Sequence, residues 1–221
     1  MLNDTEIEKA ITARQQNSAE GISIEEFEEE SLTPIGYDLR VGKEYFSWKK
    51  QRIFPIKDEN PLNIKANDTV VIRTYESVKL SKKIGATIHS MATKVSLGLS
   101  HISTTVDPGW TGTMLITVHN YRNDDIELKF KERFCTLCFH EMKIEATRGV
   151  RSDHNREDIW SRLREIDNKT IKQQKIFVTF CISLVSILAF FIYIKYPSLF
   201  EWLQKFLKSI LELIKLIPSL W

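Results

Sequence analysis

From Leu32 to Phe139 the chain is a succession of short apolar runs, several alternating with polar residues and most separated by Gly, Pro, Asn or Lys. Runs of this kind at spacings of roughly 8–12 residues are typical of strands in an all-β sandwich or barrel. The expected strands cover residues 37–42, 45–48, 53–56, 62–64, 70–74, 77–80, 84–88, 114–118, 126–130 and 134–139. The pattern predicts a mainly β domain with almost no helix.

A short helix is expected ahead of this domain, over residues 3–15. Ile7, Ala10 and Ile11 recur at helical spacing and would form one apolar face. Asn3, Asp4 or Thr5 could cap the helix, because the side chains of these residue types accept hydrogen bonds from its first free N–H groups.

Beyond Lys143 the composition changes, and residues 146–175 are densely charged. Ile159, Leu163, Ile166 and Thr170 recur at spacings of 4, 3 and 4. We interpret them as the narrow apolar seam of a helical linker or stalk, with a coiled coil of under two heptads as one form of it.

Residues 176–194 are 19 consecutive residues without a charge, close to the ~20 that a helix needs to cross a bilayer. The run is apolar all round and is flanked by Lys172, Lys175 and Lys195, which disfavours the alternative of a buried core helix. The sequence therefore predicts a transmembrane helix over residues 176–195.

After Pro197, residues 198–221 predict an amphipathic helix, because apolar residues recur on one face and lysines on the other. Such a helix is typical of a segment that lies on a membrane surface. A partner-binding, self-assembling or pore-lining role remains open. The apolar face comprises Leu203, Phe206, Leu207, Ile210, Leu211, Ile214 and Ile217.

We expect four parts: a β domain over residues 1–145, the linker or stalk over 146–175, the transmembrane helix over 176–195 and the amphipathic helix over 198–221. The N-terminus is polar and has no apolar core of a secretory signal, so we expect a single-pass membrane protein whose β domain is cytoplasmic. Five basic residues before the span and four after it do not decide the orientation. The odd, low count of three cysteines also suggests a reducing compartment.

The net charge and the spacing of the cysteines predict no further binding site. The net charge of +2 argues neither for nor against nucleic acid, and no nucleic-acid partner is expected. Cys135 and Cys138 have CxxC spacing but lie in an expected strand, where residues three apart point to opposite faces, so no metal site is predicted. The chain has neither a P-loop nor a dinucleotide-binding glycine fingerprint.

The strongest functional signal is the turn Val106-Asp-Pro-Gly-Trp-Thr-Gly112, which continues into the apolar run 114–118. An ordinary β-hairpin would have this pattern. A turn this rich in glycine, with an aspartate beside a strand, is also how a backbone passes close to a small ligand.

Several segments, in order, resemble the dCTP deaminases and the trimeric dUTPases, and the resemblance covers roughly residues 1–142. Residues 32–42, LTPIGYDLRVG, resemble the P-x-S-Y-D-L-R-L-G strand of dCTP deaminases, and residues 2–8 resemble the helix before it. Residues 76–80, ESVKL, resemble the T-x-E-x-V-x-L-P segment. The turn 106–112 is similar to the I-D-P-G-[WFY]-x-G turn of both families, and Asn120 closes the hairpin as it does in them.

The resemblance implies a distorted, dUTPase-like β-barrel that assembles as a homotrimer with nucleotide sites between subunits. In the deaminases a glutamate five residues after the last glycine of the turn moves the protons, and this chain has Thr117 there, which cannot act as a general base. In the dUTPases the turn aspartate orients the attacking water, and Asp107 occupies that position. The glycine-rich C-terminal arm of dUTPases has no counterpart.

The families share a phosphate-binding Ser with an Arg four residues on. Counting back from Asp107 gives Ser90 and Lys94, and a lysine neutralises a phosphate without gripping it bidentately. The Leu97-Gly98-Leu99 piece suggests a register two residues different, with Ser96 at the Arg position.

Our leading hypothesis is a membrane-anchored protein that binds a pyrimidine deoxynucleotide and acts as a sensor or effector with a degenerate site. The alternative is an active enzyme: a dUTP hydrolase in which Asp107 activates water, or a dCTP deaminase with a displaced carboxylate. A third is a structural tether with an empty site. Membrane lipid is the other expected partner, and Mg²⁺ could accompany a bound triphosphate. The expected binding residues are Ser90, Lys94, Ser103, Thr104, Val106, Asp107, Trp110, Gly112 and Thr117.

Overall fold

The computed structural model describes residues 1–101, 103–148, 156–198, 201, 204–205 and 208–209. The chain divides into two compact units, Met1–Asn168 and Lys169–Trp221. The first unit contains the β domain and the first turns of a long helix, and the second contains the rest of that helix.

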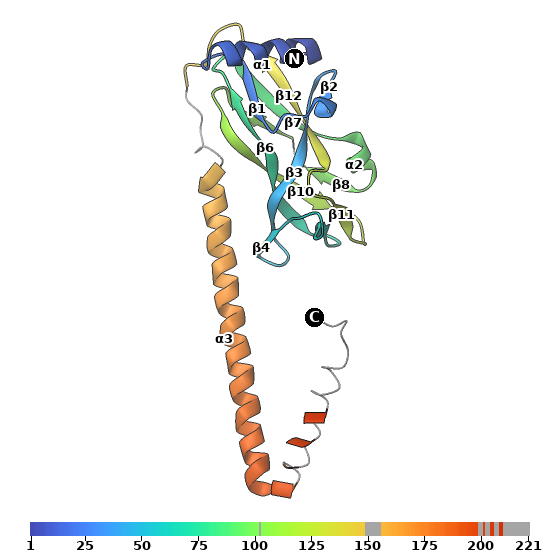
Figure 1. Cartoon of the computed structure of the whole chain (residues 1–221), viewed down its shortest axis with the longest axis vertical. Coiled ribbons are helices and arrows are strands. Elements are labelled where there is room, and N and C mark those ends of the chain that lie inside the picture. Colours follow the sequence, from blue (N-terminus) through green and yellow to red (C-terminus); the bar gives the residue numbers. More distant parts are fainter. Residues whose placement is uncertain (102, 149–155, 199–200, 202–203, 206–207, 210–221) are drawn as a thin grey trace. The chain divides into compact units, whose positions relative to one another are not determined.

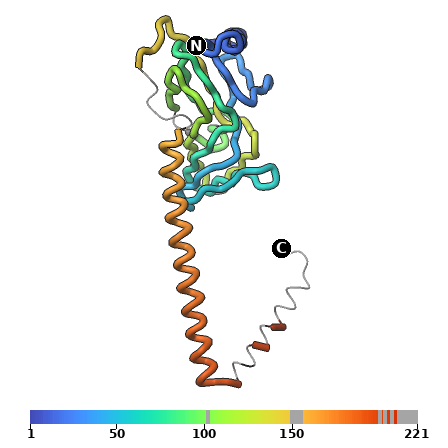
Figure 2. Tube along the Cα trace, turned by 60° about the vertical axis from the view of Figure 1, so that its left-hand side comes forward, coloured from blue at the N-terminus to red at the C-terminus, as the bar shows by residue number. Residues whose placement is uncertain are grey.

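The N-terminal helix α1 spans Asp4–Gln16, as predicted. Of the three candidate caps, Asn3 fills the role: its side chain accepts from the N–H of Glu6, and the Glu6 side chain accepts from the N–H of Asn3 in return. Such a reciprocal pair satisfies two free donors of the first turn. Ile7 is the buried residue of α1, and Leu2 donates its N–H to the carbonyl of Phe139 at 2.8 Å, so the helix covers one end of the β domain (Figures 1 and 2).

One ten-stranded sheet forms most of the β domain, in the order β8-β10-β6-β3-β12-β7-β9, with β1 added to β6 and both β2 and β4 added to β3. The two ends of this path, β8 and β9, are separated by two residues in sequence, so the sheet curls back on itself (Figure 1). The mainly β, barrel-like fold is therefore confirmed. The strands are β1 (Ile22–Glu25), β2 (Leu32–Thr33), β3 (Gly36–Ser47), β4 (Arg52–Pro55), β5 (Leu62–Ile64), β6 (Thr69–Leu80), β7 (Ile84–Ser90), β8 (Leu99–His101), β9 (Thr104–Val106), β10 (Thr111–Asn120), β11 (Ile126–Leu128) and β12 (Arg133–Glu141).

Three smaller elements complete the domain. Strands β5 and β11 pair with each other in a separate two-stranded sheet. A short 3₁₀ helix, Glu29–Ser31, precedes β2, and a five-residue helix α2, Ala92–Ser96, follows β7.

Two pairs of expected strands are each one continuous strand, β3 and β6. The polar residues between their apolar runs suggested turns, but β3 continues through an irregularity in its pairing with β6 between Val41 and Tyr45. Gly42 lies there, and a Cβ on it would sit 2.3 Å from the carbonyl oxygen of Arg73, so only glycine fits this approach. In β6 the interrupting Glu76 is fully buried and paired.

Alternate residues of the strands point into one large core, which explains the period-two pattern of the sequence. In β10, for example, Met114, Ile116 and Val118 are buried, whereas Thr117 between them is exposed. The core includes side chains from the N-terminal helix as well as from nearly every strand, among them Tyr37, Leu39, Ile72, Leu137 and Phe139.

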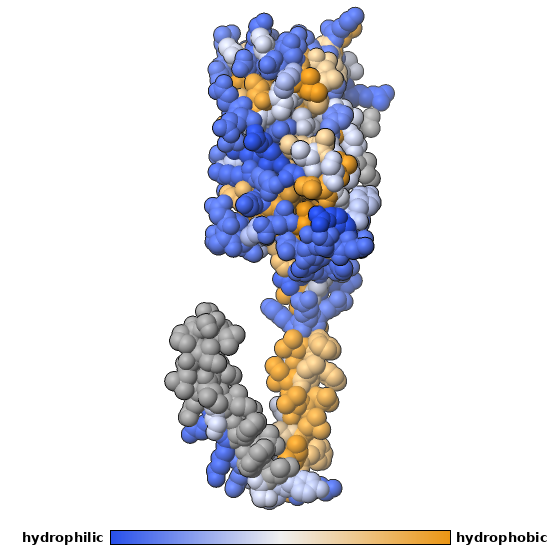
Figure 3. Space-filling model, turned by 90° about the vertical axis from the view of Figure 1, so that its right-hand side faces the viewer, coloured by the Kyte–Doolittle hydropathy of each residue, from blue (hydrophilic) through white to orange (hydrophobic). Residues whose placement is uncertain are grey.

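The long helix α3 spans Glu157–Lys195, so the expected stalk and transmembrane segment belong to one helix. It is long and apolar enough to cross a membrane, and the most apolar stretch has no buried residue. Figure 3 shows these side chains as a hydrophobic surface on the helix. The hydroxyls of Thr179, Ser183 and Ser186 each donate to the carbonyl four residues earlier, at 2.9 Å, as expected for polar groups in an apolar surrounding. Most of the expected amphipathic helix lies outside the described residues.

The apolar seam expected for a coiled coil packs instead against the β domain of the same chain. Trp160 and Leu163 are buried in a second small core with Phe46 and Val71, and Ile159 and Ile166 pack at its edge together with Ile53 and Leu115. The stalk interpretation is thus corrected for this part of the helix, because the seam finds its apolar partner on the outer face of the sheet.

Candidate functional site

The turn between β9 and β10 is fixed by its own backbone and by the loop after β6. The N–H of Trp110 donates to the carbonyl of Asp107 at 3.2 Å, and Gly109, with a φ of 81°, donates to the carbonyl of Ser81 at 3.1 Å. The Trp110 side chain is buried, and its Nε1 donates to the carbonyl of Gly112 at 3.0 Å. Trp110, Gly112 and the buried Val106 therefore shape the turn, and Asp107 is held at its start.

A groove of about 870 Å³ lies along the outer face of β10. Thr117 is exposed on the floor of this groove. His119, two residues on, lines the same floor, and its Nδ1 lies 2.9 Å from the hydroxyl of Thr69. The ring of Tyr121 packs edge-on against His119, with centroids 4.4 Å apart. The floor thus offers a hydroxyl, an imidazole and an exposed aromatic ring.

The walls of the groove come from two different parts of the chain. One part is the start of β9, with Thr104 and the preceding Ser103, whose hydroxyl donates to the carbonyl of Ile88 at 2.7 Å. The other is the start of α3. The full lining comprises Trp48, Thr69, Val71, Ile88, Ser100, Ser103, Thr104, Leu115, Ile116, Thr117, Val118, His119, Tyr121, Arg156, Ile159 and Leu163.

The two expected phosphate contacts, Ser90 and Lys94, lie away from this groove. Ser90 is the last residue of β7 and pairs with Cys135 of β12. Lys94 lies in α2 and forms an ion pair with Glu132, in which both side chains are partly shielded from solvent. The alternative register places Ser96 at the end of the same short helix.

Within one chain the nine expected binding residues fall into three groups. Ser103, Thr104 and Thr117 line the groove, and Val106, Asp107, Trp110 and Gly112 make the turn. Ser90 and Lys94 line neither. Ser90 ends β7, two residues beyond the groove-lining Ile88 and four beyond Ala86, the partner of Val106, which is about 13 Å along a strand; Lys94 lies in α2. The turn thus connects two strands that contribute to the groove, and the phosphate pair is not among the residues that line it.

Two other motif residues, Arg40 and Glu76, form a buried ion pair between β3 and β6. Glu76 accepts hydrogen bonds from the Nε of Arg40 at 2.6 Å and from its backbone N–H at 2.9 Å. Burial raises the pKa of Glu76, and the two hydrogen bonds from Arg40 act in the opposite direction. The guanidinium also lies 5.1 Å from the ring centroid of Tyr75. Neither charged residue lines the groove, so this part of the motif supports the sheet.

The cysteines and histidines do not gather into a metal-binding group among the described residues. Cys135 and Cys138 are free and buried, and burial raises the pKa of both thiols. His89 and His140 share one partner, because the Nε2 atoms of both lie within 3.0 Å of the Thr87 hydroxyl.

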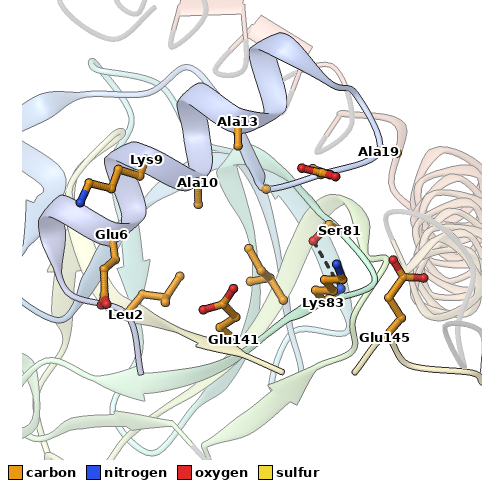
Figure 4. A pocket seen from close by; sticks show the side chains of 13 residues that line it. Leu2, Glu6, Lys9, Ala10, Ala13, Ala19, Ser81, Lys83, Glu141 and Glu145 are labelled. Carbon is orange, nitrogen blue, oxygen red and sulfur yellow. Dashed lines mark hydrogen bonds between the residues drawn. The ribbon is translucent and has the colours of Figure 1, made fainter. Parts of the chain in front are cut away.

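A second pocket, of about 370 Å³, lies between α1 and the loop after β6 (Figure 4). Glu6, Lys9, Lys83, Glu141 and Glu145 are among the residues that surround it, so charges of both signs face one space. None of the expected binding residues lines it. We therefore take the groove over Thr117 as the candidate site.

Sequence reasoning missed six of the nine polar and aromatic residues that line this groove. His119 could have been found, because in a strand it must share the face of Thr117. Trp48 and Tyr121 follow strand ends, where the pattern gives no direction. Arg156 lies in the segment that was interpreted as a stalk.

The β domain is similar in sequence to known proteins. The family model described as dCTP deaminase-like matches residues 1–142. A dCTP deaminase of Thermococcus kodakarensis is 33% identical over 133 residues, which are 60% of this chain and 84% of the relative. A dCTP deaminase of Pyrococcus horikoshii is 36% identical over 118 residues, 53% of this chain and 74% of the relative. Among solved structures, a 2'-deoxycytidine 5'-triphosphate deaminase from Agrobacterium tumefaciens has a TM-score of 0.49 at 15% identity, over 62% of this chain and 47% of its own.

Proposed function

The chain belongs to the dCTP deaminase-like family, and from this premise we propose that its β domain binds a pyrimidine deoxynucleotide in the groove over Thr117 without deaminating it. The protein is then a sensor or effector whose nucleotide site is connected to a membrane helix.

The observation that carries this proposal is the chemistry of the groove. None of the sixteen described residues that line it is Asp or Glu. Deamination at C4 of cytosine needs a group that takes a proton from water and passes it on, which the glutamate does in the deaminases that the chain resembles. Thr117 stands at that position, and a hydroxyl can donate and accept hydrogen bonds but cannot take up a proton near neutral pH.

The same groove contains groups that can bind a nucleotide. The hydroxyls of Ser103, Thr104 and Thr117 can bond the polar edge of a pyrimidine, and Trp48 and Tyr121 are exposed aromatic rings against which a base or sugar can pack. Arg156 is the cation of the lining residues; its Nε lies 3.6 Å from the Oδ1 of Asp158, and a guanidinium has four further N–H donors for a phosphate. Because the lining has no carboxylate, Mg²⁺ would bind through the phosphates of a triphosphate.

The family resemblance supports a homotrimer, and the separation of the expected residues along β7 is a reason for one. A second subunit could bring its Ser90 and Lys94 to the groove that a single chain leaves without them. Light scattering of the detergent-solubilised protein should therefore give three chains per particle.

Anchoring in a membrane is supported by the apolar part of α3. Its large side chains are exposed, among them Phe177, Phe180 and Phe191, and lysines flank the run. A helix that exposes such side chains all round is stable in lipid and not in water. We propose a single-pass anchor that contacts membrane lipid, with the β domain in the cytoplasm.

One experiment separates binding from catalysis. The full chain in detergent is titrated with dCTP and dUTP by calorimetry, and the same samples are assayed for uracil formation and pyrophosphate release. We expect binding of at least one of the two nucleotides, and neither product. Turnover that is lost in Asp107→Asn would contradict the proposal in favour of a dUTPase-like hydrolase. Absence of heat with both nucleotides would favour a structural tether.

A further inference from the structure

The start of α3 forms one wall of the candidate groove. We name residues 156–167 the docking segment. Arg156, Ile159 and Leu163 line the groove together with Ser103, Thr104 and Thr117. The docking segment lies beyond residue 142, where the family match ends, so the common fold of the family does not supply this wall.

Apolar contacts hold the middle of the docking segment on the outer face of the sheet. Trp160 is fully buried and Leu163 is 4% exposed, against Phe46 of β3 and Val71 of β6. Burying a large aromatic side chain of this kind contributes on the order of 2–3 kcal/mol. This surface is therefore a real packing interface and not a chance approach.

Polar contacts fix both ends of the docking segment. At its start, Glu157 accepts two hydrogen bonds from the guanidinium of Arg73, each of 3.0 Å, and the same guanidinium lies 4.8 Å from the ring centroid of Trp160. At its end, Asp167 accepts from the Nε of Arg52 at 2.6 Å and from the backbone N–H of Ile53 at 3.3 Å. The two anchors fix the helical turns that carry Ile159 and Leu163, and Arg156 directly precedes the first anchor.

Leu163 belongs both to the small core and to the lining of the groove. Arg156 precedes the first helical residue and lines the groove as its cation. A ligand that fills the groove therefore contacts side chains of the docking segment as well as Thr117.

We propose that the docking segment is part of the nucleotide site, with Arg156, Ile159 and Leu163 as ligand-contacting residues. This inference rests on the proposed function and adds how nucleotide binding is coupled to the long helix. A ligand that contacts the docked segment stabilises the docked state, and docking raises the affinity for the ligand by the same factor. The docking segment and the apolar part of α3 belong to one helix. A bound nucleotide that stabilises docking therefore also constrains the start of the helix proposed to cross the membrane.

The test is amide hydrogen exchange on the full chain in detergent micelles, without nucleotide and with saturating dCTP or dUTP. We expect the nucleotide that binds by calorimetry to slow exchange of the amides in residues 157–167. The variant Asp167→Ala removes the second anchor without touching the groove, because Asp167 does not line it. We expect this variant to exchange faster in the segment and to bind the nucleotide about fivefold more weakly. Arg164→Ala, whose side chain is exposed on the same helix, is the matched control and should match the wild type.

The outcomes distinguish this inference from the proposed function. Binding that leaves the exchange of residues 157–167 unchanged overturns the docking segment as a ligand wall, and the nucleotide-binding function stands. Faster exchange in Asp167→Ala with wild-type affinity also overturns it, because coupling must act in both directions. If neither nucleotide binds the wild-type protein, both proposals are wrong.

Discussion

Lys94 of α2 is paired with Glu132, the residue that precedes β12. Glu132 also accepts a hydrogen bond from the backbone N–H of Lys129 at 2.7 Å, so its carboxylate is held in place independently of Lys94. The cation expected to meet a phosphate is therefore already neutralised within its own chain. A phosphate can bind Lys94 only in competition with Glu132 or in addition to it.

Replacing Glu132 by Gln should raise the affinity for a nucleotide if Lys94 contacts a phosphate. The change removes the competing charge and keeps the shape of the side chain. Partly exposed ion pairs are worth about 0.2–1 kcal/mol, so we expect the dissociation constant to fall by a factor of about 1.4 to 5. Lys94→Ala should raise it by a similar factor. Calorimetry of the full chain with dCTP and dUTP at low salt measures both.

The control for this pair is Lys82→Ala, an exposed lysine outside the groove. If Lys94 has only a structural role, Glu132→Gln and Lys94→Ala will both lower the melting temperature and leave the affinity unchanged, and the family-based assignment of Lys94 will be wrong.

The sequence predicted the elements that bury one face and expose the other, because their apolar and polar residues alternate with a clear period. The period-two pattern located the central strands, and the caps and apolar face located α1. The pattern failed at Glu76 and around Gly42, because a buried ion pair and a close backbone approach look like turn residues in sequence. It also could not say what the seam of Ile159, Leu163 and Ile166 packs against, since a helix and the face of a sheet offer the same apolar surface.

The sequence predicted site residues that are close to the turn in the chain, but not the contacts between segments that are far apart in the chain. Thr104 of β9 and Thr117 of β10 were found because the turn that joins their strands is recognisable. The relation of Ser90 to Asp107 depends on the pairing of β7 with β9, which no local pattern encodes. Arg156 enters the groove through long-range docking and carries no signal of its own.

Thr117→Val tests whether the hydroxyl on the floor of the groove contacts the ligand. Valine keeps the branched shape and removes the hydrogen-bonding group. Loss of one hydrogen bond of about 0.5–1.5 kcal/mol should weaken nucleotide binding about two- to twelvefold. Thr111→Val, on the same face of β10 and outside the groove, is the control and should bind normally, as measured by calorimetry. If both variants bind the nucleotide as tightly as the wild type, the ligand does not contact the hydroxyl of Thr117.

His140 should make the β domain less stable in mild acid. Partial burial, the positive N-terminus and His89 lower the pKa of His140 below its ordinary value. Between that lowered pKa and the ordinary value near 6.5 the unfolded chain binds more protons than the folded chain, so stability falls as the pH falls through this window. Thermal unfolding at pH 7.5 and pH 5.5 measures the difference. His140→Gln, which can still bond Thr87, should reduce it, and an unchanged pH dependence would assign the effect to other groups.

Asn120 gives the sharpest prediction for stability, because a single buried amide joins three segments. Its Nδ2 donates to the carbonyls of Ile64, Lys65 and Asp124 at 2.9–3.2 Å, and its Oδ1 accepts from the N–H of Arg122 at 2.9 Å. Asn120→Ala leaves these groups without the side-chain partner and should lower the free energy of unfolding by about 2–4 kcal/mol.

Asn120→Asp should be worse than Asn120→Ala near neutral pH, because it turns a carboxylate towards three carbonyl oxygens and buries its charge. Its deficit should shrink in acid, where the protonated carboxyl regains one donor, whereas the deficit of the alanine variant should not. Thermal unfolding followed by the β-sheet signal of circular dichroism compares the two variants at each pH. A milder effect of Asp than of Ala at neutral pH would mean that water reaches this amide and that the end of β10 is held by its backbone alone.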